Sequence, residues 1–214
     1  MNKINVYKHI DYTLLKPDAT YKDIFNLCRE ALVKSCASVC IPPHYVKFAH
    51  RCCPSLNICT VVGFPLGNST TEAKISEAIT AISNGANEID MVINISELKN
   101  EDYEYVTDEI NKIQDAIGDD HILKVIIETC YLTQKEIRII TKLIDAFTPA
   151  AYIKTSTGFG TRGASIKDIT TIKSCIQFGT KIKASGGIHT YKEMERYISL
   201  GCDRIGTSQL PPKK

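Results

Sequence analysis

Three lysines of this chain lie within short apolar segments, where a charged side chain is costly to bury. They are Lys124, Lys154 and Lys183, in the runs 123–127, 151–155 and 181–185. Burial and like-charge neighbours both disfavour the ammonium form, so a buried cluster of lysines should contain at least one neutral amine. A neutral amine attacks carbonyl carbons, and the chemistry that these residues could perform is therefore Schiff-base formation.

The composition is that of one globular domain. With 214 residues, 43% of them hydrophobic, the chain can bury one substantial core, and no segment has the composition of a linker. Residues 1–214 are therefore predicted to form a single domain. The net charge of +2 is nearly balanced and basic residues are spread along the chain, so we expect no nucleic-acid partner and no membrane partner.

Targeting and metal-binding signals are missing from the sequence. Residues 1–5 lack the apolar stretch of a secretion signal, and no run is long enough to cross a bilayer, which predicts a cytoplasmic protein. The nine cysteines include no C-x-x-C pair, which favours free thiols in a reducing compartment. Cys36, Cys40 and His44 match no common zinc spacing, and the five histidines show no ligand spacing, so neither a metal nor another cofactor is expected.

Runs rich in β-branched residues recur along the chain and are predicted to be strands. The eight runs are 9–15, 38–41, 58–62, 88–94, 123–129, 151–156, 181–185 and 203–207. Most of the segments between them have the apolar spacing of helices. Several begin with a hydroxyl residue three positions before an acidic one, which is typical of a helix start: Ser69 with Glu72, Thr133 with Glu136, Ser165 with Asp168, and Thr190 with Glu193.

Strands that alternate with helices form parallel sheets, and eight such units favour a closed (β/α)8 TIM barrel over an open doubly wound sheet. An open sheet would place a glycine-rich fingerprint after its first strand, where this chain has residues 14–18, Leu-Leu-Lys-Pro-Asp. The end is short for a barrel, because Pro211 and Pro212 preclude a normal final helix after the eighth strand.

Alternation along the predicted strands indicates which side chains point inward. Successive side chains of a strand point to opposite faces, so Asp90 shares a face with Glu88, and Lys124, Lys154 and Lys183 each share a face with other polar residues. The opposite faces carry Ile, Met and Val, which suit packing against helices. The polar set should therefore face the barrel interior, where the three lysines would converge with Asp90.

Seven ordered motifs across nearly the whole chain give it a resemblance to the 2-deoxyribose-5-phosphate aldolase family. They are I-D-Y-T-L-L-K-P at 10–17, V-V-G-F-P-L-G at 61–67, E-I-D-M-V-I-N at 88–94, K-V-I-I-E-T at 124–129, I-K-T-S-T-G-F at 153–159, K-A-S-G-G-I at 183–188 and R-I-G-T-S at 204–208. The chain departs from the family pattern at Tyr12, where histidine is usual, at Cys130, where glycine is common, and after Ser208.

The resemblance implies a metal-independent class I aldolase that reversibly cleaves 2-deoxy-D-ribose 5-phosphate to D-glyceraldehyde 3-phosphate and acetaldehyde, in deoxyribonucleoside catabolism. It implies Lys154 as the Schiff-base lysine, Lys183 as the neighbouring cation that keeps Lys154 neutral, and Asp90 as the acidic partner in proton transfer. Asp90 should not form a tight pair with Lys154, since such a pair would cancel the effect of Lys183.

The same resemblance assigns further residues to the site. Its supporting residues are Lys124, Thr157, Asp11 and Thr13, and its phosphate-binding residues are Gly158, Gly186, Gly187, Gly206 and Ser208. The family is compatible with a homodimer. Two alternatives stay open at this point: a Schiff-base barrel with another phosphorylated sugar or keto acid as substrate, and a barrel that binds sugar phosphates without efficient catalysis.

Overall fold

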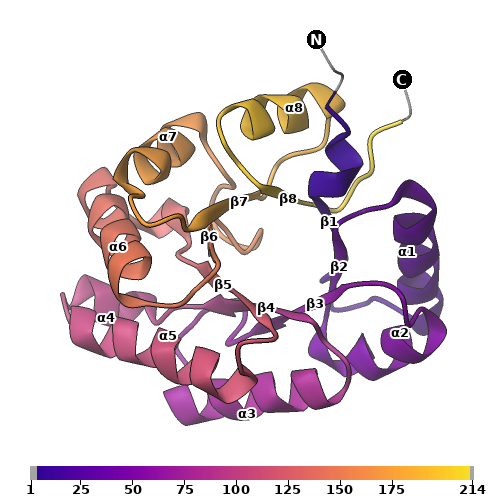
Figure 1. Cartoon of the computed structure of the whole chain (residues 1–214), viewed down its shortest axis with the longest axis horizontal. Coiled ribbons are helices and arrows are strands. Elements are labelled where there is room, and N and C mark those ends of the chain that lie inside the picture. Colours follow the sequence, from indigo (N-terminus) through magenta and orange to yellow (C-terminus); the bar gives the residue numbers. More distant parts are fainter. Residues whose placement is uncertain (1–3, 213–214) are drawn as a thin grey trace.

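The computed structural model describes residues 4–212 and has eight parallel strands closed into one barrel (Figure 1). Each strand pairs with the next, and β8 pairs with both β7 and β1. The predicted (β/α)8 fold is therefore confirmed. The strands are β1 Ile10–Thr13, β2 Ser38–Ile41, β3 Ile58–Val62, β4 Glu88–Val92, β5 Ile122–Ile126, β6 Tyr152–Lys154, β7 Lys181–Ser185 and β8 Arg204–Thr207.

Helices form a ring outside the barrel (Figure 1). They are α1 Tyr21–Lys34, α2 Val46–Cys52, α3 Thr71–Ser83, α4 Ile95–Lys99, α5 Tyr103–Ile117, α6 Gln134–Phe147, α7 Ile166–Cys175 and α8 Tyr191–Ser199, with the 3-10 helices η1 Val6–His9, η2 Pro43–Tyr45 and η3 Thr129–Tyr131. Outward-facing strand residues such as Ile89 and Met91 are fully buried under this ring and form the core. From residue 4 to residue 212, no helix has the length and apolarity that a membrane span requires.

Three of the predicted helix starts are confirmed and one is wrong. Thr133 and Thr190 form complete capping boxes at the starts of α6 and α8, and the Ser165 side chain accepts a hydrogen bond from the backbone at the start of α7. Helix α3 begins one residue later than expected, because Thr70 rather than Ser69 accepts the hydrogen bond of the Ala73 backbone N–H. Two adjacent hydroxyl residues made the cap ambiguous in the sequence.

Several strands are shorter than their predicted runs. The run 88–94 stops at Val92, because the Asn94 side chain accepts hydrogen bonds from two backbone N–H groups and caps α4. The run 123–129 is shifted to Ile122–Ile126, since Glu128 adopts a left-handed φ of 48° that no strand can include. The runs 9–15, 151–156 and 203–207 are also trimmed at their ends. The polar residues after these strands therefore lie in loops at the carboxyl-terminal mouth of the barrel.

The barrel closes at a seam where the described chain has no helix after β8. After β8, the described chain continues to Pro212 without helical structure, as the prolines predicted. This tail and η1 run side by side between α8 and α1 (Figure 1). The Tyr7 hydroxyl donates a hydrogen bond to the Pro211 carbonyl at 2.8 Å, which joins the two segments.

Candidate active site

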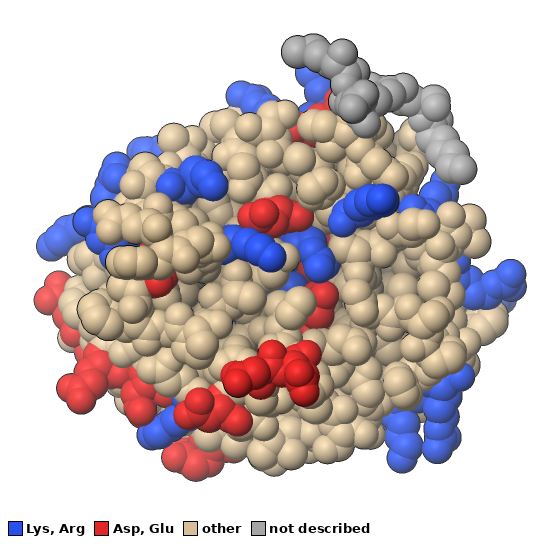
Figure 2. Space-filling view, viewed as in Figure 1, with Lys and Arg blue, Asp and Glu red and all other residues tan. Residues whose placement is uncertain are grey.

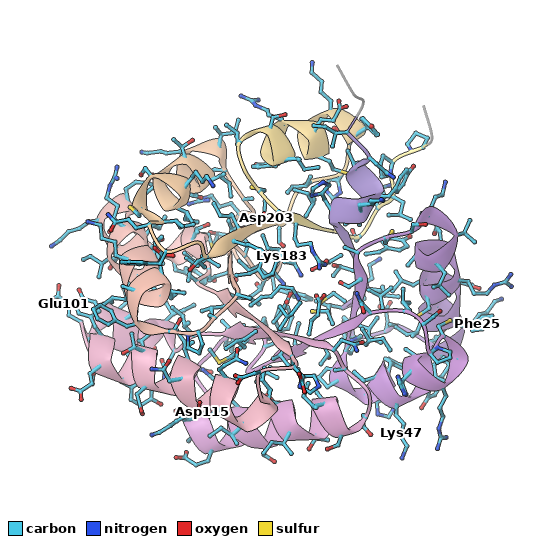
Figure 3. The ribbon with its side chains drawn as sticks, viewed as in Figure 1. Phe25, Lys47, Glu101, Asp115, Lys183 and Asp203 are labelled. Atoms are coloured by element: carbon cyan, nitrogen blue, oxygen red, sulfur yellow. The ribbon has the colours of Figure 1, made fainter. Side chains whose placement is uncertain are left out.

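The barrel interior is filled with charged side chains instead of the apolar layers common in this fold. They are Asp11 from β1, Glu88 and Asp90 from β4, Lys124 from β5, Lys154 from β6, Lys183 from β7 and Arg204 from β8. The three lysines are at most 3% exposed. Lys183 lies near the barrel axis, whereas Phe25, Lys47, Glu101 and Asp115 lie around the outside (Figure 3). The predicted convergence of the lysines with Asp90 is therefore found in the structure.

Strand register explains why these side chains meet. Lys154 is the register partner of Lys183 across β6 and β7, and Asp90 is the partner of Lys124 across β4 and β5. Residues paired in this way leave the sheet at the same level and on the same face. Closure of the barrel then brings the four side chains from the sheet face to a common centre.

Asp90 is the centre of the cluster. Its Oδ2 atom accepts hydrogen bonds from Lys154 Nζ and Lys183 Nζ, both at 2.7 Å, and its Oδ1 atom accepts one from Lys124 Nζ at 2.9 Å. The expectation that Asp90 and Lys154 avoid a tight pair is therefore wrong. A fully buried carboxylate needs its charge compensated, and the lysine at the mouth side of the cluster lies within reach.

The neighbouring lysines determine the protonation state of Asp90. Burial by itself raises the pKa of a carboxyl group, but the lysine charges, that of Lys124 above all and also that of Lys183, outweigh this effect and hold the pKa of Asp90 well below its usual range. The Cys59 thiol lies 3.1 Å from Asp90 Oδ1, and burial is the main reason why its pKa is raised well above the ordinary value. Asp90 is thus an anion beside ammonium groups and the neutral Cys59 thiol.

A second group of charges lies beside the first, and the sequence analysis assigned only Asp11 of this group to the site and missed Glu88 and Arg204. Arg204 binds Asp11 Oδ1 at 2.6 Å and Glu88 Oε1 at 3.3 Å. Asp11 in turn lies 2.5 Å from Lys183, and Glu88 lies 2.6 Å from Lys124. Glu88 was predicted to face inward, but neither its role nor that of Arg204 followed from alternation alone. Charged side chains of both signs gather around the barrel axis on the face drawn in Figure 2.

A cavity of about 340 Å³ opens at the carboxyl ends of the strands. Within the described part of the chain, Lys154 is the one member of the buried charged cluster that lines it. The cavity brings together seven other residues that the sequence analysis assigned to the site: Thr13, Thr157, Gly158, Gly186, Gly187, Gly206 and Ser208. It also includes Lys16 and His189, two basic residues that had no predicted role. Asp90, Lys124, Lys183 and Asp11 are buried beside the cavity but not in its wall.

Glycines form one wall of this cavity. Gly187 has a φ of 72° and no atom within 4 Å of the position where a Cβ would lie, so its backbone is open to the cavity. A Cβ on Gly206 would lie 2.3 Å from the Ser185 hydroxyl oxygen, so a side chain there would displace this hydroxyl. A wall of exposed backbone N–H groups is suited to an anionic oxygen ligand such as phosphate.

The loop after β6 is held in place by Glu128. The backbone N–H and the hydroxyl of Thr157 both donate to the Glu128 carboxylate, and the Thr157 hydroxyl oxygen accepts a hydrogen bond from the Phe159 N–H at 3.0 Å. Glu128 and Thr157 are both buried. These contacts fix the loop that carries Gly158 next to Lys154.

Among residues 4–212, one set of side chains has the spacing of potential metal ligands. Ligand atoms of Cys40, Cys59 and Asp90 lie within 4.8 Å of one another. Both oxygens of Asp90 already bind ammonium groups, and Lys124 Nζ lies 3.3 Å from the Cys59 sulfur. Lysine ammonium groups at this distance compete with a further cation, so the donor set suits ion pairing rather than a metal.

Comparison with known proteins identifies the family of this barrel. A family model described as DeoC/LacD family aldolase matches residues 6–202. The chain belongs to this family. The DeoC/LacD aldolase is 51% identical over 210 residues to a deoxyribose-phosphate aldolase of Clostridium botulinum, a match that covers 98% of this chain and 94% of the relative.

Solved structures of this DeoC/LacD aldolase's relatives have the same fold. An aldolase named QR15 superposes with a TM-score of 0.92 at 38% identity and covers 96% of this chain and 92% of its own. The tetrameric deoxyribose phosphate aldolase of Aeropyrum pernix superposes with a TM-score of 0.86 at 32% identity, covering 95% of this chain and 86% of its own. Barrel, buried cluster and cavity thus belong to an aldolase scaffold.

Proposed function

We propose that this DeoC/LacD aldolase is a deoxyribose-phosphate aldolase, which reversibly cleaves 2-deoxy-D-ribose 5-phosphate to D-glyceraldehyde 3-phosphate and acetaldehyde. The observation that carries the proposal is the position of Lys154. It is the lysine of the buried cluster that reaches the cavity, and the lining of that cavity is rich in glycine. The relatives named for this activity are about half identical over nearly their whole length.

The reaction begins at the Lys154 amine. In its neutral form, Nζ adds to the C1 aldehyde carbon of the open-chain sugar, and loss of water from the resulting carbinolamine gives an iminium ion. Asp90 lies beside Nζ on the barrel side and binds Lys183 through the same oxygen, so the carbonyl approaches Nζ from the cavity. This restriction orients the carbonyl toward one nitrogen.

Cleavage then uses the iminium as an electron sink. The C3 hydroxyl loses its proton, the C2–C3 bond breaks, and its electron pair moves to the iminium nitrogen to form an enamine. Protonation of the enamine at C2 and hydrolysis of the new iminium release acetaldehyde. Asp90 is buried and does not line the cavity, but its Oδ2 atom lies 2.7 Å from Lys154 Nζ. We therefore assign Asp90 to proton transfer through a water molecule that enters beside Nζ.

The phosphate of the substrate suits the other end of the cavity. Gly187 offers open backbone there, and Gly186, Gly206 and Ser208 line the same cavity. Phosphate binding by the loops after strands seven and eight is frequent in this fold. Lys16, which also lines the cavity, adds a positive charge for the dianion.

A trapping experiment tests the proposal. The protein is incubated with acetaldehyde at neutral pH, reduced with borohydride and digested, and the mass spectrum is searched for an ethyl group on Lys154. We expect the adduct on Lys154 and none there in Lys154→Met, in which cleavage of deoxyribose 5-phosphate also falls by about a thousandfold or more. An unmodified Lys154 would leave a barrel that only binds sugar phosphates.

A panel of aldehyde donors separates this activity from that of a Schiff-base barrel with another substrate. Acetaldehyde should be the preferred donor, and preference for a keto acid would contradict the proposal. The homodimer and the cytoplasmic location remain predictions from the sequence.

A further inference from the structure

The buried charges of the barrel interior do not balance when every group is ionised. Three carboxylates, those of Asp11, Glu88 and Asp90, face four basic side chains, those of Lys124, Lys154, Lys183 and Arg204. An uncompensated charge in a low-dielectric interior is strongly disfavoured, and a group that can release a proton does so. One of the four basic groups should therefore be neutral.

The contacts identify which group this is. Arg204 keeps its charge at any ordinary pH and binds two carboxylates. Lys124 lies within 4 Å of three carboxylates, and Lys183 binds two. Within the described part of the chain, Lys154 forms an ion pair with Asp90 alone, and it shares the bound oxygen with Lys183. Loss of a proton from Lys154 therefore costs the fewest ion pairs.

We propose that Arg204 and Glu88 are positioning residues that keep Lys154 neutral by fixing the number of charges around Asp11 and Asp90. This inference rests on the proposed function, since it explains how the Schiff-base lysine becomes nucleophilic. Neither residue lines the cavity. Arg204 occupies the oxygens of Asp11 and Glu88 that would otherwise be available to the lysines. Its guanidinium is further held 5.8 Å from the centre of the Tyr152 ring.

Other titratable groups around Lys154 do not alter this balance of three carboxylates and four basic side chains. Cys40 faces it from β2 and Cys59 from β3, each with its sulfur near Asp90. A hydrogen bond from Cys59 would lower the pKa of Cys40, but the single thiol proton of Cys59 donates to Asp90 Oδ1 at 3.1 Å, so both thiols count as neutral. The remaining titratable groups on this side are Glu128, Lys16 and His189. The carboxylate oxygens of Glu128 bind Thr157 in the loop after β6, and Lys16 and His189 line the cavity.

The experiment measures the pH at which adduct formation with acetaldehyde at Lys154 reaches half of its maximum. Removal of the Arg204 charge in Arg204→Gln lets Lys154 keep its proton, and the midpoint should rise by about one pH unit. Removal of the Glu88 charge in Glu88→Gln adds one excess positive charge, and the midpoint should fall by about one unit. The double variant Glu88→Gln/Arg204→Gln should return close to the midpoint of the unchanged protein.

Controls separate charge from damage to the fold. Arg138→Gln, at an exposed position of α6, makes the same change in net charge outside the barrel interior and should not move the midpoint. Structural damage would lower the extent of adduct formation in both single variants without shifts of opposite sign. If Arg204→Gln does not fold, the inference is tested by the fall of the midpoint in Glu88→Gln and by its return in the double variant.

The outcomes distinguish this inference from the proposed function. An adduct on Lys154 with midpoints that do not move, or that move in the same direction, overturns the inference alone. No adduct in the unchanged protein overturns the proposed function and this inference with it.

Discussion

Lys154 and Lys183 donate hydrogen bonds to the same carboxylate oxygen, Asp90 Oδ2, each at 2.7 Å. The two lysines are register partners on adjacent strands, so the backbone itself holds their amines together. Two ammonium groups on one oxygen repel each other, and the repulsion is relieved when one of them loses its proton. Lys183 also binds Asp11, and Lys154 does not, which makes Lys183 the better holder of the charge.

Replacement of Lys183 by Met should therefore impair Lys154 without removing it. Lys154 becomes the only cation on Asp90 Oδ2 and keeps its proton, so we expect adduct formation with acetaldehyde to need a higher pH. The turnover of deoxyribose 5-phosphate at neutral pH should fall by about a hundredfold, with partial recovery as the pH is raised. Steady-state rates across pH provide the measurement. A loss of turnover that is equal at every pH would argue for a different role of Lys183.

A glycine in the cavity wall provides a test of phosphate binding. Gly187→Ala should raise KM for deoxyribose 5-phosphate by about tenfold, because the new methyl group projects into the space assigned to the phosphate. Gly179→Ala is the matched control: that glycine also has a positive φ and open space around its Cβ position, but it lies outside the cavity. Both variants should lose about 1 kcal/mol of stability from the left-handed backbone. Equal KM values for the two would place the phosphate elsewhere.

The buried carboxylates should make the fold sensitive to acid. The charges of Lys183, Lys124 and Arg204 outweigh burial and hold the pKa of Asp11 below its ordinary value, and Asp90 behaves likewise. Such groups contribute stability that is present above their unfolded pKa of about 4 and is lost as the pH falls toward the folded values. The free energy of unfolding, measured by urea denaturation, should therefore decrease below about pH 4.

Asp11→Asn should make this decrease less steep, since one depressed carboxyl is removed. It should also cost about 3 kcal/mol at neutral pH, because Lys183 and Arg204 lose a buried partner. Asp108→Asn, on the surface of α5, is the control and should leave the slope unchanged. An identical acid slope in Asp11→Asn and the unchanged protein would refute this explanation.

A buried ion pair outside the active site should also matter for stability. Lys74 of α3 and Glu109 of α5 are 2.8 Å apart and fully buried, and they bind the Val92 carbonyl and the Asn94 N–H after β4. Lys74→Met leaves Glu109 without its counter-charge and should cost about 4 kcal/mol. The exposed pair Lys112 and Asp108 should contribute less than about 1 kcal/mol. Chemical denaturation of Lys74→Met and Lys112→Met gives the comparison, and similar losses would contradict it.

Much of the fold and the centre of the site could be predicted because they depend on local pattern. Alternation along strands fixes the face of each side chain, and the order of the strands fixes their neighbours, so Lys124, Lys154 and Lys183 could be placed together with Asp90. The contact of Asp90 with Lys154 depends on the torsions of a long flexible side chain, which no pattern encodes. The expectation of no tight pair was wrong for this reason.

The part played by Arg204 could not be predicted for a different reason. It lies at the first residue of β8, where a basic residue usually turns to solvent, and its partners Asp11 and Glu88 are distant in sequence. Only closure between β8 and β1 brings them into contact. Alternation likewise places Lys181 on the same face of its strand as Lys183. Lys181 is however the first residue of β7 and is exposed, and its ammonium lies 5.6 Å from the centre of the Tyr152 ring.

The seam between α8 and α1 makes this barrel suited to relocation of its chain ends. Tyr7 and Pro211 are in contact, so a short linker could join the two end segments without disturbing β1 or β8. New termini could be opened at Gly118, which follows α5 and has no atom within 4 Å of its Cβ position, outside the cavity. Such a circular permutant keeps every strand pair but changes which of them closes the barrel last. It would thereby show whether β8 must join a preformed sheet or can nucleate one.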